Sequence, residues 1–497
     1  MERLNKISLP DHSDQVLVST TANRVAIHRA VQAGRLRRLA PKIYTSNLQD
    51  APEKIVRAHC WALAGALFPG ALIADRTALE QRPADDGSVF LVTDRRTTDL
   101  ALPGLTFRPR QGPPPVKGYD MPFLDGLWMS SQARALLDNL RPTRKRSHIA
   151  ATLTRGELEL FLEKLLRQGG EAVINRLRDQ ARELAGQLGL MERAEELSTL
   201  IGALLGTREA RLSTEPGRAR SLGEGYDMDR LQLLESLRAA LAVHPFPERA
   251  ARADNSFLPF FESYFSNFIE GTEFEVGEAY SIVYEGRIPA ERPGDAHDVL
   301  GTFRVVSDAA EMRRTADTAE EFLHLLRHRH AVIMGNRPEK SPGQFKSANN
   351  RAGDSLFVEP DLVTGTLRRG FALLPTLPHP LARAIYAMFL VAEVHPFADG
   401  NGRVARVMMN AELCRGGLER IIIPSVFRTE YLQALRALTH NQRPGAIISV
   451  MDYAQRFTAA VDFSDYGQAV LKLDECHAFA APADAMGNGM KLLVPDP

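Results

Sequence analysis

The stretch His395-Pro-Phe-Ala-Asp-Gly-Asn-Gly-Arg-Val-Ala-Arg406 says more about this chain than any other part of it. An apolar run at 382–394 precedes it, and a run with helically spaced apolar residues follows at 404–413. The stretch is therefore predicted to be a loop between two helices, with Gly400 and Gly402 at the N-terminus of the second. Free backbone N–H groups at such a position bind anions, so the pattern predicts an anion site.

The side chains of this stretch suit attack on a phosphate. Asn401 adds a hydrogen-bond donor beside the glycines, and Arg403 and Arg406 are three residues apart, so both can reach one polyphosphate. Asp399 is an oxygen ligand of the kind that Mg²⁺ prefers, and His395 can accept a proton near neutral pH. Together they supply the base, the metal ligand and the cations that move a nucleotide phosphate onto a hydroxyl.

Every position of this stretch matches the signature HPFx(D/E)GNGRxxR, and in this the chain resembles the Fic family of protein adenylyltransferases. The resemblance runs from about Ser256 to Phe457 and implies an all-helical domain with a β-hairpin flap, placed at residues 227–463. It implies an enzyme that uses ATP and Mg²⁺ to transfer AMP to a Ser, Thr or Tyr hydroxyl of a target protein. The roles it implies are the catalytic base for His395, the metal ligand for Asp399, and nucleotide binding for Gly400, Asn401, Gly402, Arg403 and Arg406.

A second motif, Ser266-Asn-Phe-Ile-Glu270-Gly271, matches the inhibitory helix of the same family. Ser266 and Glu270 are four residues apart and share a helix face, and Gly271 can end the helix. In similar proteins this glutamate binds the second arginine of the signature, here Arg406, and so misplaces ATP. The resemblance implies an enzyme that Glu270 autoinhibits. In some relatives the same glutamate positions a water that removes AMP, which leaves removal open here.

Residues 341–360 are predicted to form two short extended pieces around a polar turn. The family has at this place a flap that docks its target by strand addition. The flap residues expected to meet the target are Lys346, Ser347, Ala348 and Asn349, and the family usually has arginine where this chain has Lys346. Tyr431 is expected either against the adenine, as in similar proteins, or in ordinary helix packing.

The N-terminal part carries a local basic signal. Residues 14–45 are predicted as two short helices followed by a strand or turn, and residues 21–45 contain six Lys and Arg and no Asp or Glu. This is typical of a winged helix-turn-helix that binds DNA, here at residues 1–50, and the alternative is a solvated basic face. Residues 51–140 predict a small α/β module. The order resembles AbiEi-type antitoxin proteins, which repress their own promoter.

The remaining segments are helical, so the fold class is mainly α. Residues 141–226 are predicted as a helical connector, and residues 464–497 as a C-terminal helix and a tail. Three histidines, His324, His328 and His330, lie together in a basic helix. No Cys or carboxylate set completes a metal site with them, so we interpret them as solvated helix surface.

Composition limits the other function classes. The chain has 497 residues, of which 44% are hydrophobic, and Lys plus Arg equals Asp plus Glu at 61 each, so no global charge points to nucleic acid or membrane. Three separated cysteines and the lack of a secretory or spanning apolar segment predict a cytoplasmic protein without a membrane partner. The expected partners are an unidentified target protein and DNA, with a homo-oligomer left open. The alternative function is a DNA-binding transcriptional regulator, like an antitoxin, in which the Fic domain is only a sensor.

Overall fold

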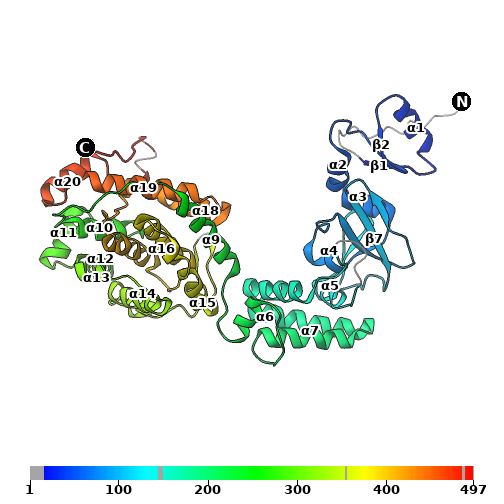
Figure 1. The fold of residues 1–497 in the computed structure, drawn as a ribbon, viewed down its shortest axis with the longest axis horizontal. Coiled ribbons are helices and arrows are strands. Elements are labelled where there is room, and N and C mark those ends of the chain that lie inside the picture. The colour runs from blue at the N-terminus through cyan, green and yellow to red at the C-terminus, as the bar shows by residue number, and fades with distance from the viewer. Residues whose placement is uncertain (1–15, 144–148, 353–354, 484–486, 488, 496–497) are drawn as a thin grey trace. The chain divides into compact units, whose positions relative to one another are not determined.

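The computed structural model describes residues 16–143, 149–352, 355–483, 487 and 489–495. The chain divides into two compact units, and the boundary in the sequence falls between Ser221 and Leu222 (Figure 1). Each unit has hydrophobic clusters of its own. The stretch 395–406 lies in the second unit.

The first unit begins with a small antiparallel sheet of order β1-β3-β2, formed by β1 (Val16–Val18), β2 (Arg37–Ala40) and β3 (Ile43–Thr45), with helix α1 (Arg24–Gln32) between β1 and β2. The prediction of two short helices at 14–45 is wrong for the described residues 16–45, which contain one helix. The run Val16-Leu17-Val18 forms a strand because it pairs with β3 and is rich in β-branched residues. Residues 16–45 therefore lack the helix pair of a helix-turn-helix, and residues 1–15 lie outside the described residues.

The α/β module predicted at 51–140 is present as a six-stranded mixed sheet of order β6-β7-β5-β4-β9-β8. Its elements are α2 (Pro52–Ala58), α3 (Cys60–Leu67), β4 (Leu72–Ile73), α4 (Asp75–Glu80), β5 (Ser88–Thr93), β6 (Leu100–Leu102), β7 (Leu105–Gln111), β8 (Met121–Pro122), η1 (Leu124–Gly126), β9 (Trp128–Met129) and α5 (Gln132–Asn139). Strand β5 is buried over most of its length, as its continuous apolar run predicts for a central strand.

The first unit continues through three helices, α6 (Arg155–Leu188), α7 (Met191–Leu204) and α8 (Glu215–Ser221). The leucine stripe Leu158, Leu162 and Leu166 of α6 is buried in one cluster with Leu136 of α5 and Leu197 of α7. Residues 155–221 thus belong to the core of the first unit and do not form the connector predicted for 141–226. The stripe buries against the α/β module because an apolar helix face is stable only when it is covered.

The second unit is helical, apart from one hairpin, as predicted. Its helices are α9 (Met228–Val243), α10 (Leu258–Ile269), α11 (Val276–Glu285), α12 (Pro293–Ser307), α13 (Ala309–Met312), α14 (Ala319–Ile333), α15 (Pro360–Phe371), α16 (Pro380–Val394), α17 (Asn401–Arg415), α18 (Arg428–Asn441), α19 (Pro444–Ala460) and α20 (Tyr466–Glu475), with single 3₁₀ turns η2 (Pro338–Lys340), η3 (Leu374–Thr376) and η4 (Ser425–Phe427). The hairpin is β10 (Arg351–Ala352) and β11 (Ser355–Leu356), an antiparallel pair.

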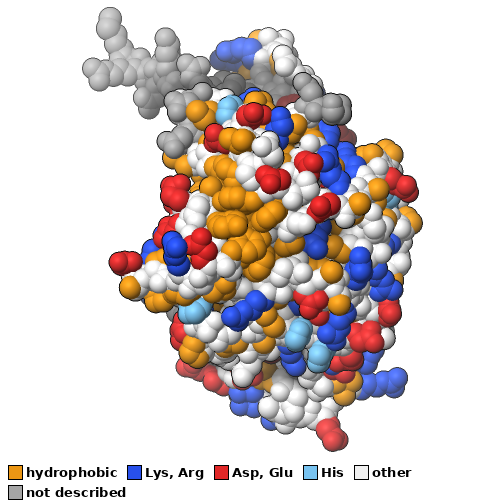
Figure 2. All heavy atoms as spheres, turned by 90° about the vertical axis from the view of Figure 1, so that its left-hand side faces the viewer, with side chains coloured by type: hydrophobic (Ala, Val, Ile, Leu, Met, Phe, Trp, Pro, Cys, Tyr) orange, Lys and Arg blue, Asp and Glu red, His pale blue; other side chains and the backbone are white. Residues whose placement is uncertain are grey.

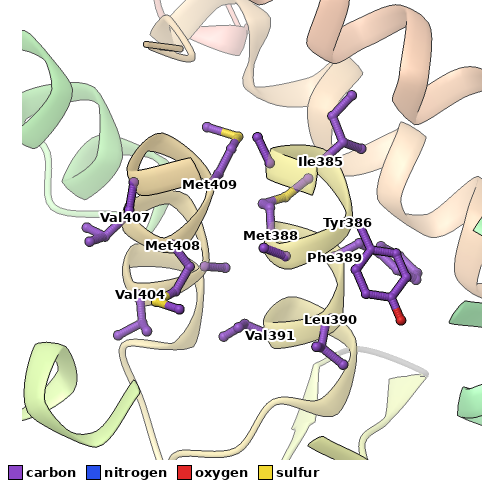
Figure 3. Packing of buried hydrophobic residues seen from close by; sticks show 14 of the residues in the cluster. Ile385, Tyr386, Met388, Phe389, Leu390, Val391, Val404, Val407, Met408 and Met409 are labelled. Atoms are coloured by element: carbon purple, nitrogen blue, oxygen red, sulfur yellow. The ribbon is translucent and has the colours of Figure 1, made fainter. Parts of the chain in front are cut away.

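Helices α16 and α17 form the centre of this unit. Figure 3 shows Met388 and Val391 of α16 pointing toward α17, and Met409 of α17 pointing toward α16; all three side chains are buried. Two helices packed this closely fix both ends of the short loop between them. The core therefore holds the loop 395–400 rigidly, as the site requires.

The C-terminal helix predicted at 464–497 is α20, and it packs on the core of the second unit. Leu473 of α20 is buried with Phe261 and Phe265 of α10, and the rings of Tyr466 and Tyr280 lie 4.3 Å apart. Figure 2 looks onto the end of the molecule that carries α11 and α20, where hydrophobic side chains gather amid charged ones. No helix in the described part of the chain is long and apolar enough to cross a membrane.

Candidate active site

The loop between α16 and α17 is closed by its own asparagine. Asn401 Oδ1 accepts from the Phe397 backbone N–H at 2.8 Å, and Asn401 Nδ2 donates to the Phe397 carbonyl at 2.9 Å. Gly400 ends the loop in the left-handed region, with φ of 73°. The Asn401 amide therefore closes the loop with its oxygen and one N–H, and donation of its second N–H to a phosphate stays a prediction.

His395 lies at the C-terminal end of α16, also in the left-handed region, with φ of 53°. Its Nδ1 is 3.3 Å from the Ala392 carbonyl. A carbonyl oxygen can only accept, so Nδ1 carries the proton and Nε2 keeps a free lone pair. The Phe357 ring stacks on the imidazole at 3.7 Å and 9°, and burial lowers the pKa of His395 to about 4. The imidazole is therefore neutral at pH 7, with Nε2 able to accept a proton.

A cavity of about 250 Å³ lies beside this histidine. Its wall includes His395 and Gly402 of the loop region, Arg406 of α17, Glu270 and Tyr431. The other lining residues are Arg230, Phe357, Phe389, Ala392, Glu393, Leu432, Leu435, Arg436 and Thr439. The structure thus brings the His395 imidazole, the N-terminus of α17 and the Arg406 guanidinium to one cavity. Residues of α9, α16 and α18, and Glu270 at the end of α10, complete its wall.

Arg406, one of three arginines that line this cavity, is held by the end of helix α10. Arg406 donates from Nη2 to Glu270 Oε1 at 2.7 Å and to the Ser266 carbonyl at 2.8 Å, and from Nε to Ser266 Oγ at 3.0 Å. Burial lowers the pKa of Arg406, but the charge and hydrogen bond of Glu270, together with Tyr431, raise the pKa above its usual value. Gly271, with φ of 92°, follows directly, and α10 ends at this point as predicted.

Glu270 also covers the anion site. A Cβ atom built on Gly402 would collide with Glu270 Oε1, so the carboxylate fills the space over the first turn of α17. A helix N-terminus favours a negative charge there. The glutamate thus occupies both the positive helix end and the arginine that a phosphate would use.

Arg403, the other arginine of the signature, faces away from this cavity. Its Nη1 pairs with Asp298 of α12 at 2.8 Å, and its Nη2 lies 3.7 Å from Asp399. The side chain is nearly buried. In this structure Arg403 ties α17 to α12 and orients Asp399, whereas the sequence placed both arginines on one polyphosphate.

Asp399 is the one loop residue suited to a metal. Its carboxylate accepts from the Gly400 N–H at 2.7 Å and lies 3.4 Å from Lys340 Nζ. Burial raises the pKa of Asp399, but the hydrogen bond from Gly400 and the charges of Arg403 and Lys340 have the larger combined effect. The pKa is therefore below its usual value, and the carboxylate is ionised at neutral pH. Among the described residues no group of three His, Cys, Asp or Glu could hold a metal ion. One carboxylate fits Mg²⁺ only as a partner of substrate phosphates and water, which is how Mg²⁺ is usually bound.

Tyr431 lies in the wall and is fully buried. Its hydroxyl contacts Met388 Sδ at 3.1 Å, and burial raises its pKa. Tyr431 thus packs α18 on α16 and lines the cavity, and its contact with an adenine stays a prediction.

The flap differs from its predicted form. Its strands lie at 351–352 and 355–356, after the residues expected to meet a target. Ser347, Ala348 and Asn349 are exposed, but Lys346 is buried; its Nζ donates to Asn350 Oδ1 at 2.7 Å, and its N–H donates to the Pro396 carbonyl at 2.8 Å. Burial lowers the pKa of Lys346 to about 8. Lys346 therefore anchors the flap to the catalytic loop.

Three contacting groups escaped the sequence analysis. His330 was expected on the solvated surface, which is wrong, because it is fully buried with both ring nitrogens bonded. Its helix has an apolar face, and His330 lies four residues after Leu326 on that face, a spacing that could have revealed it. Phe357 covers His395, and Arg230 pairs with Glu393 and donates to the Leu356 carbonyl at 2.7 Å. No local pattern marks these last contacts.

The fold and the site together define a helical domain that places His395 and the glycine-rich N-terminus of α17 at one helix junction. Residues 322–413 match the model of the Fic/DOC family, so the second unit contains a Fic domain. The predicted resemblance is confirmed at this level. The comparisons do not address the resemblance of the N-terminal part to AbiEi-type proteins.

Several curated relatives share this part of the chain. The chain is 28% identical over 227 residues to the protein adenylyltransferase Fic of Drosophila persimilis, and 26% identical over 226 residues to that of Drosophila melanogaster. The first match covers 44% of both proteins, so the chain spans less than half the length of these relatives. Among solved structures, Fic-1 from C. elegans covers 67% of this chain at 18% identity with a TM-score of 0.33.

Proposed function

We propose that the protein is an adenylyltransferase that moves AMP from ATP, with Mg²⁺, to a Ser, Thr or Tyr hydroxyl of a target protein. The observation that carries this is the single cavity that gathers a neutral His395 with Nε2 free, the N-terminus of α17 at Gly402, and Arg406. The relatives named as adenylyltransferases support it. The glycine-rich sequence 400–402 also favours AMP, because phosphate-transferring relatives depart from it.

The chemistry assigned to this site is one displacement at the α-phosphorus. His395 Nε2 removes the proton from the target hydroxyl as its oxygen forms a bond to the α-phosphorus. The bond from that phosphorus to the oxygen bridging to the β-phosphate breaks, and pyrophosphate leaves. The N–H groups at the start of α17 and the Arg406 guanidinium would take the phosphate charge, and Asp399 would hold Mg²⁺ against the phosphates.

We further propose that Glu270 holds the enzyme in an inactive state. Its carboxylate lies over Gly402 and pairs with Arg406, so a bound polyphosphate would compete for both. Ser266 adds two more bonds to the same guanidinium. Removal of AMP by a water near Glu270 belongs to the same proposal as a second reaction of the site.

The test uses ATP labelled at either end. Glu270→Gly protein is incubated with Mg²⁺ and ATP carrying label on the α- or the γ-phosphate, and the protein is then examined for label. The proposal expects α-label and no γ-label, and expects His395→Ala to abolish it. Transfer of γ-label would identify a kinase, and absence of both would refute transfer of any kind.

A second candidate function is DNA binding by the N-terminal part. The observation in its favour is the exposure of Arg24, Arg29, Arg35, Arg38 and Lys42 in a segment with no acidic residue. If this surface binds DNA, the full chain shifts a promoter fragment at low salt, and affinity falls steeply as salt rises. Replacing Arg35 and Arg38 together by glutamate abolishes the shift; an unchanged shift would leave a plain solvated surface.

A further inference from the structure

One buried imidazole links the two parts of the site that the target and the nucleotide would meet. His330, in the last turn of α14, has no exposed surface. Its neighbours His324 and His328 on the same helix are exposed. A buried polar side chain is costly unless each of its polar atoms has a partner, so the bonds of His330 have a structural purpose.

Both ring nitrogens of His330 bind backbone groups of different segments. The Gly343 N–H, at the base of the flap, donates to Nδ1 at 2.9 Å. Nδ1 must then be the unprotonated nitrogen, so Nε2 carries the hydrogen and donates to the Asp399 carbonyl at 3.1 Å. One fixed tautomer thus joins the flap base to the catalytic loop.

One face of the His330 ring is also covered by the catalytic loop. The imidazole stacks on Phe397 of the loop, with 3.8 Å between centroids and 2° between planes. A Cβ on Gly400 would meet Met334 Sδ at 2.9 Å and His330 Cδ2 at 3.5 Å, so the end of α14 fills the space beneath the glycine. His330 of α14 and Met334 at its end therefore support the loop at Phe397, Asp399 and Gly400.

We propose that His330 is a positioning residue, which holds the catalytic loop in register with the base of the flap so that a target hydroxyl seated at the flap meets His395 Nε2. The inference rests on the proposed function. His330 contacts no reacting atom in this scheme. It acts because Gly343 N–H to Nδ1 and Nε2–H to Asp399 form one chain of bonds through the imidazole. The separate bond from Lys346 N–H to the Pro396 carbonyl joins the same two segments.

Three substitutions separate the two bonds and the stacking. His330→Phe keeps a ring against Phe397 but loses both hydrogen bonds. His330→Gln places an amide near the Nε2 position, where it can still donate to Asp399. His330→Asn places an amide oxygen near the Nδ1 position, where it can still accept from Gly343. His328→Phe, on the exposed side of the same helix, is the matched control.

The variants are measured in the full chain carrying Glu270→Gly, by AMP transfer and by amide hydrogen exchange of the flap base. We expect His330→Phe to lower kcat by on the order of tenfold to a hundredfold, as a small displacement of reacting groups does. The KM for ATP should change little, because Arg406 is positioned by its bonds to Ser266 of α10, which His330 does not contact. Exchange at Gly343 should become faster in His330→Phe and should be restored in His330→Asn.

The outcomes are distinct. Partial rescue of kcat by Gln or Asn supports positioning by the bonds, whereas equal losses in all three variants would indicate packing alone and overturn the proposal. Transfer by His330→Phe at the parent rate would also overturn it. If the parent transfers no AMP, the proposed function fails, and the inference is then decided by exchange at Gly343, where no difference from the His328→Phe control would refute the link.

Discussion

His395 is the residue whose removal has the plainest consequence. The Nε2 atom is the proposed acceptor of the target proton, and Nδ1 is held by Ala392. His395→Ala should therefore lower transfer by about 10²- to 10⁴-fold, as loss of a general base does. ATP binding, followed with a fluorescent analogue, should persist because Arg406 and Gly402 remain. Transfer at the parent rate by the alanine variant would exclude His395 as the base.

The pH dependence of the proposed reaction follows from the burial of the His395 imidazole. Burial lowers the pKa of His395 to about 4, and only the neutral imidazole accepts a proton, so activity should be lost as the pH falls through that value and kept above it. Phe357 stacks on the ring, so Phe357→Ala should raise the pKa toward 6.5 and move the acidic limb of kcat/KM upward.

The measurement is kcat/KM for AMP transfer from about pH 4 to pH 8, the range in which a histidine base titrates, in Glu270→Gly protein with and without Phe357→Ala. Leu356→Ala, the exposed neighbour on the flap, is the control. Identical pH profiles for Glu270→Gly protein with and without Phe357→Ala would show that stacking by Phe357 does not set the pKa of His395.

Sequence reasoning at the scale of single residues succeeded where the chemistry is contiguous. His395, Gly402 and Arg406 share one cavity because a loop and the first turns of one helix carry them. It failed where a partner is distant in the chain: His330 meets Asp399 across 69 residues, and the role of Arg403 depends on Asp298 of another helix. Helical spacing cannot show such partners, since it reports only which face is buried.

At the scale of elements, the pairing of α12 with α17 makes a testable contribution to stability. Asp298 is nearly buried and pairs with Arg403 at 2.8 Å and Arg337 at 3.0 Å. Asp298→Ala leaves the buried Arg403 without this partner, which should lower the free energy of unfolding by about 3–5 kcal/mol. The measurement is denaturant unfolding followed by circular dichroism.

The matched control for this prediction is Asp295 of the same helix, which is half-buried and pairs with Arg337 at 3.1 Å. Asp295→Ala should cost only about 0–1 kcal/mol, because an ion pair near solvent contributes little. Equal effects of the two substitutions would mean that the Asp298 pair does not tie α12 to α17.

The elements were predicted unevenly. Helices α16 and α17 and the end of α10 at Glu270 follow from apolar periodicity and glycine placement, both of which are local signals. Strand β1 was predicted as helix because its few residues carry no periodicity, and its partner β3 lies 27 residues further on. The flap strands lie inside the predicted range 341–360, but each is only two residues long and carries no alternation that could place it within that range.

At the scale of the whole molecule, the two units should be separable. The hydrophobic clusters that contain α16 and α10 are formed entirely by residues after 222, and the cluster of α6 and α7 by residues before it. The sequence did not predict this boundary, since residues 141–226 were expected to be a connector. The leucine stripe of α6 indicates a buried helix face but does not show which surface covers it.

A fragment of residues 222–497 should therefore fold alone and, with Glu270→Gly, transfer AMP at a rate within about threefold of the full chain, since domains with their own cores can fold independently. Thermal unfolding and transfer of α-label are the measurements. Residues 227–463, which lack α20, provide the comparison and should be less stable. A fragment 222–497 that does not unfold cooperatively would show that the first unit completes its core.

The central claim is that Glu270 and ATP compete for Arg406 in an adenylyl-transferring site, and intact-protein mass spectrometry tests it most directly. Wild-type, Glu270→Gly, Arg406→Ala and the double variant are incubated with ATP and Mg²⁺, and the gain of one AMP is measured. We predict a clear gain for Glu270→Gly alone, with the double variant matching Arg406→Ala, because residues that act as one unit are not additive. Equal modification of wild-type and Glu270→Gly protein, or gain in the double variant, would contradict the account.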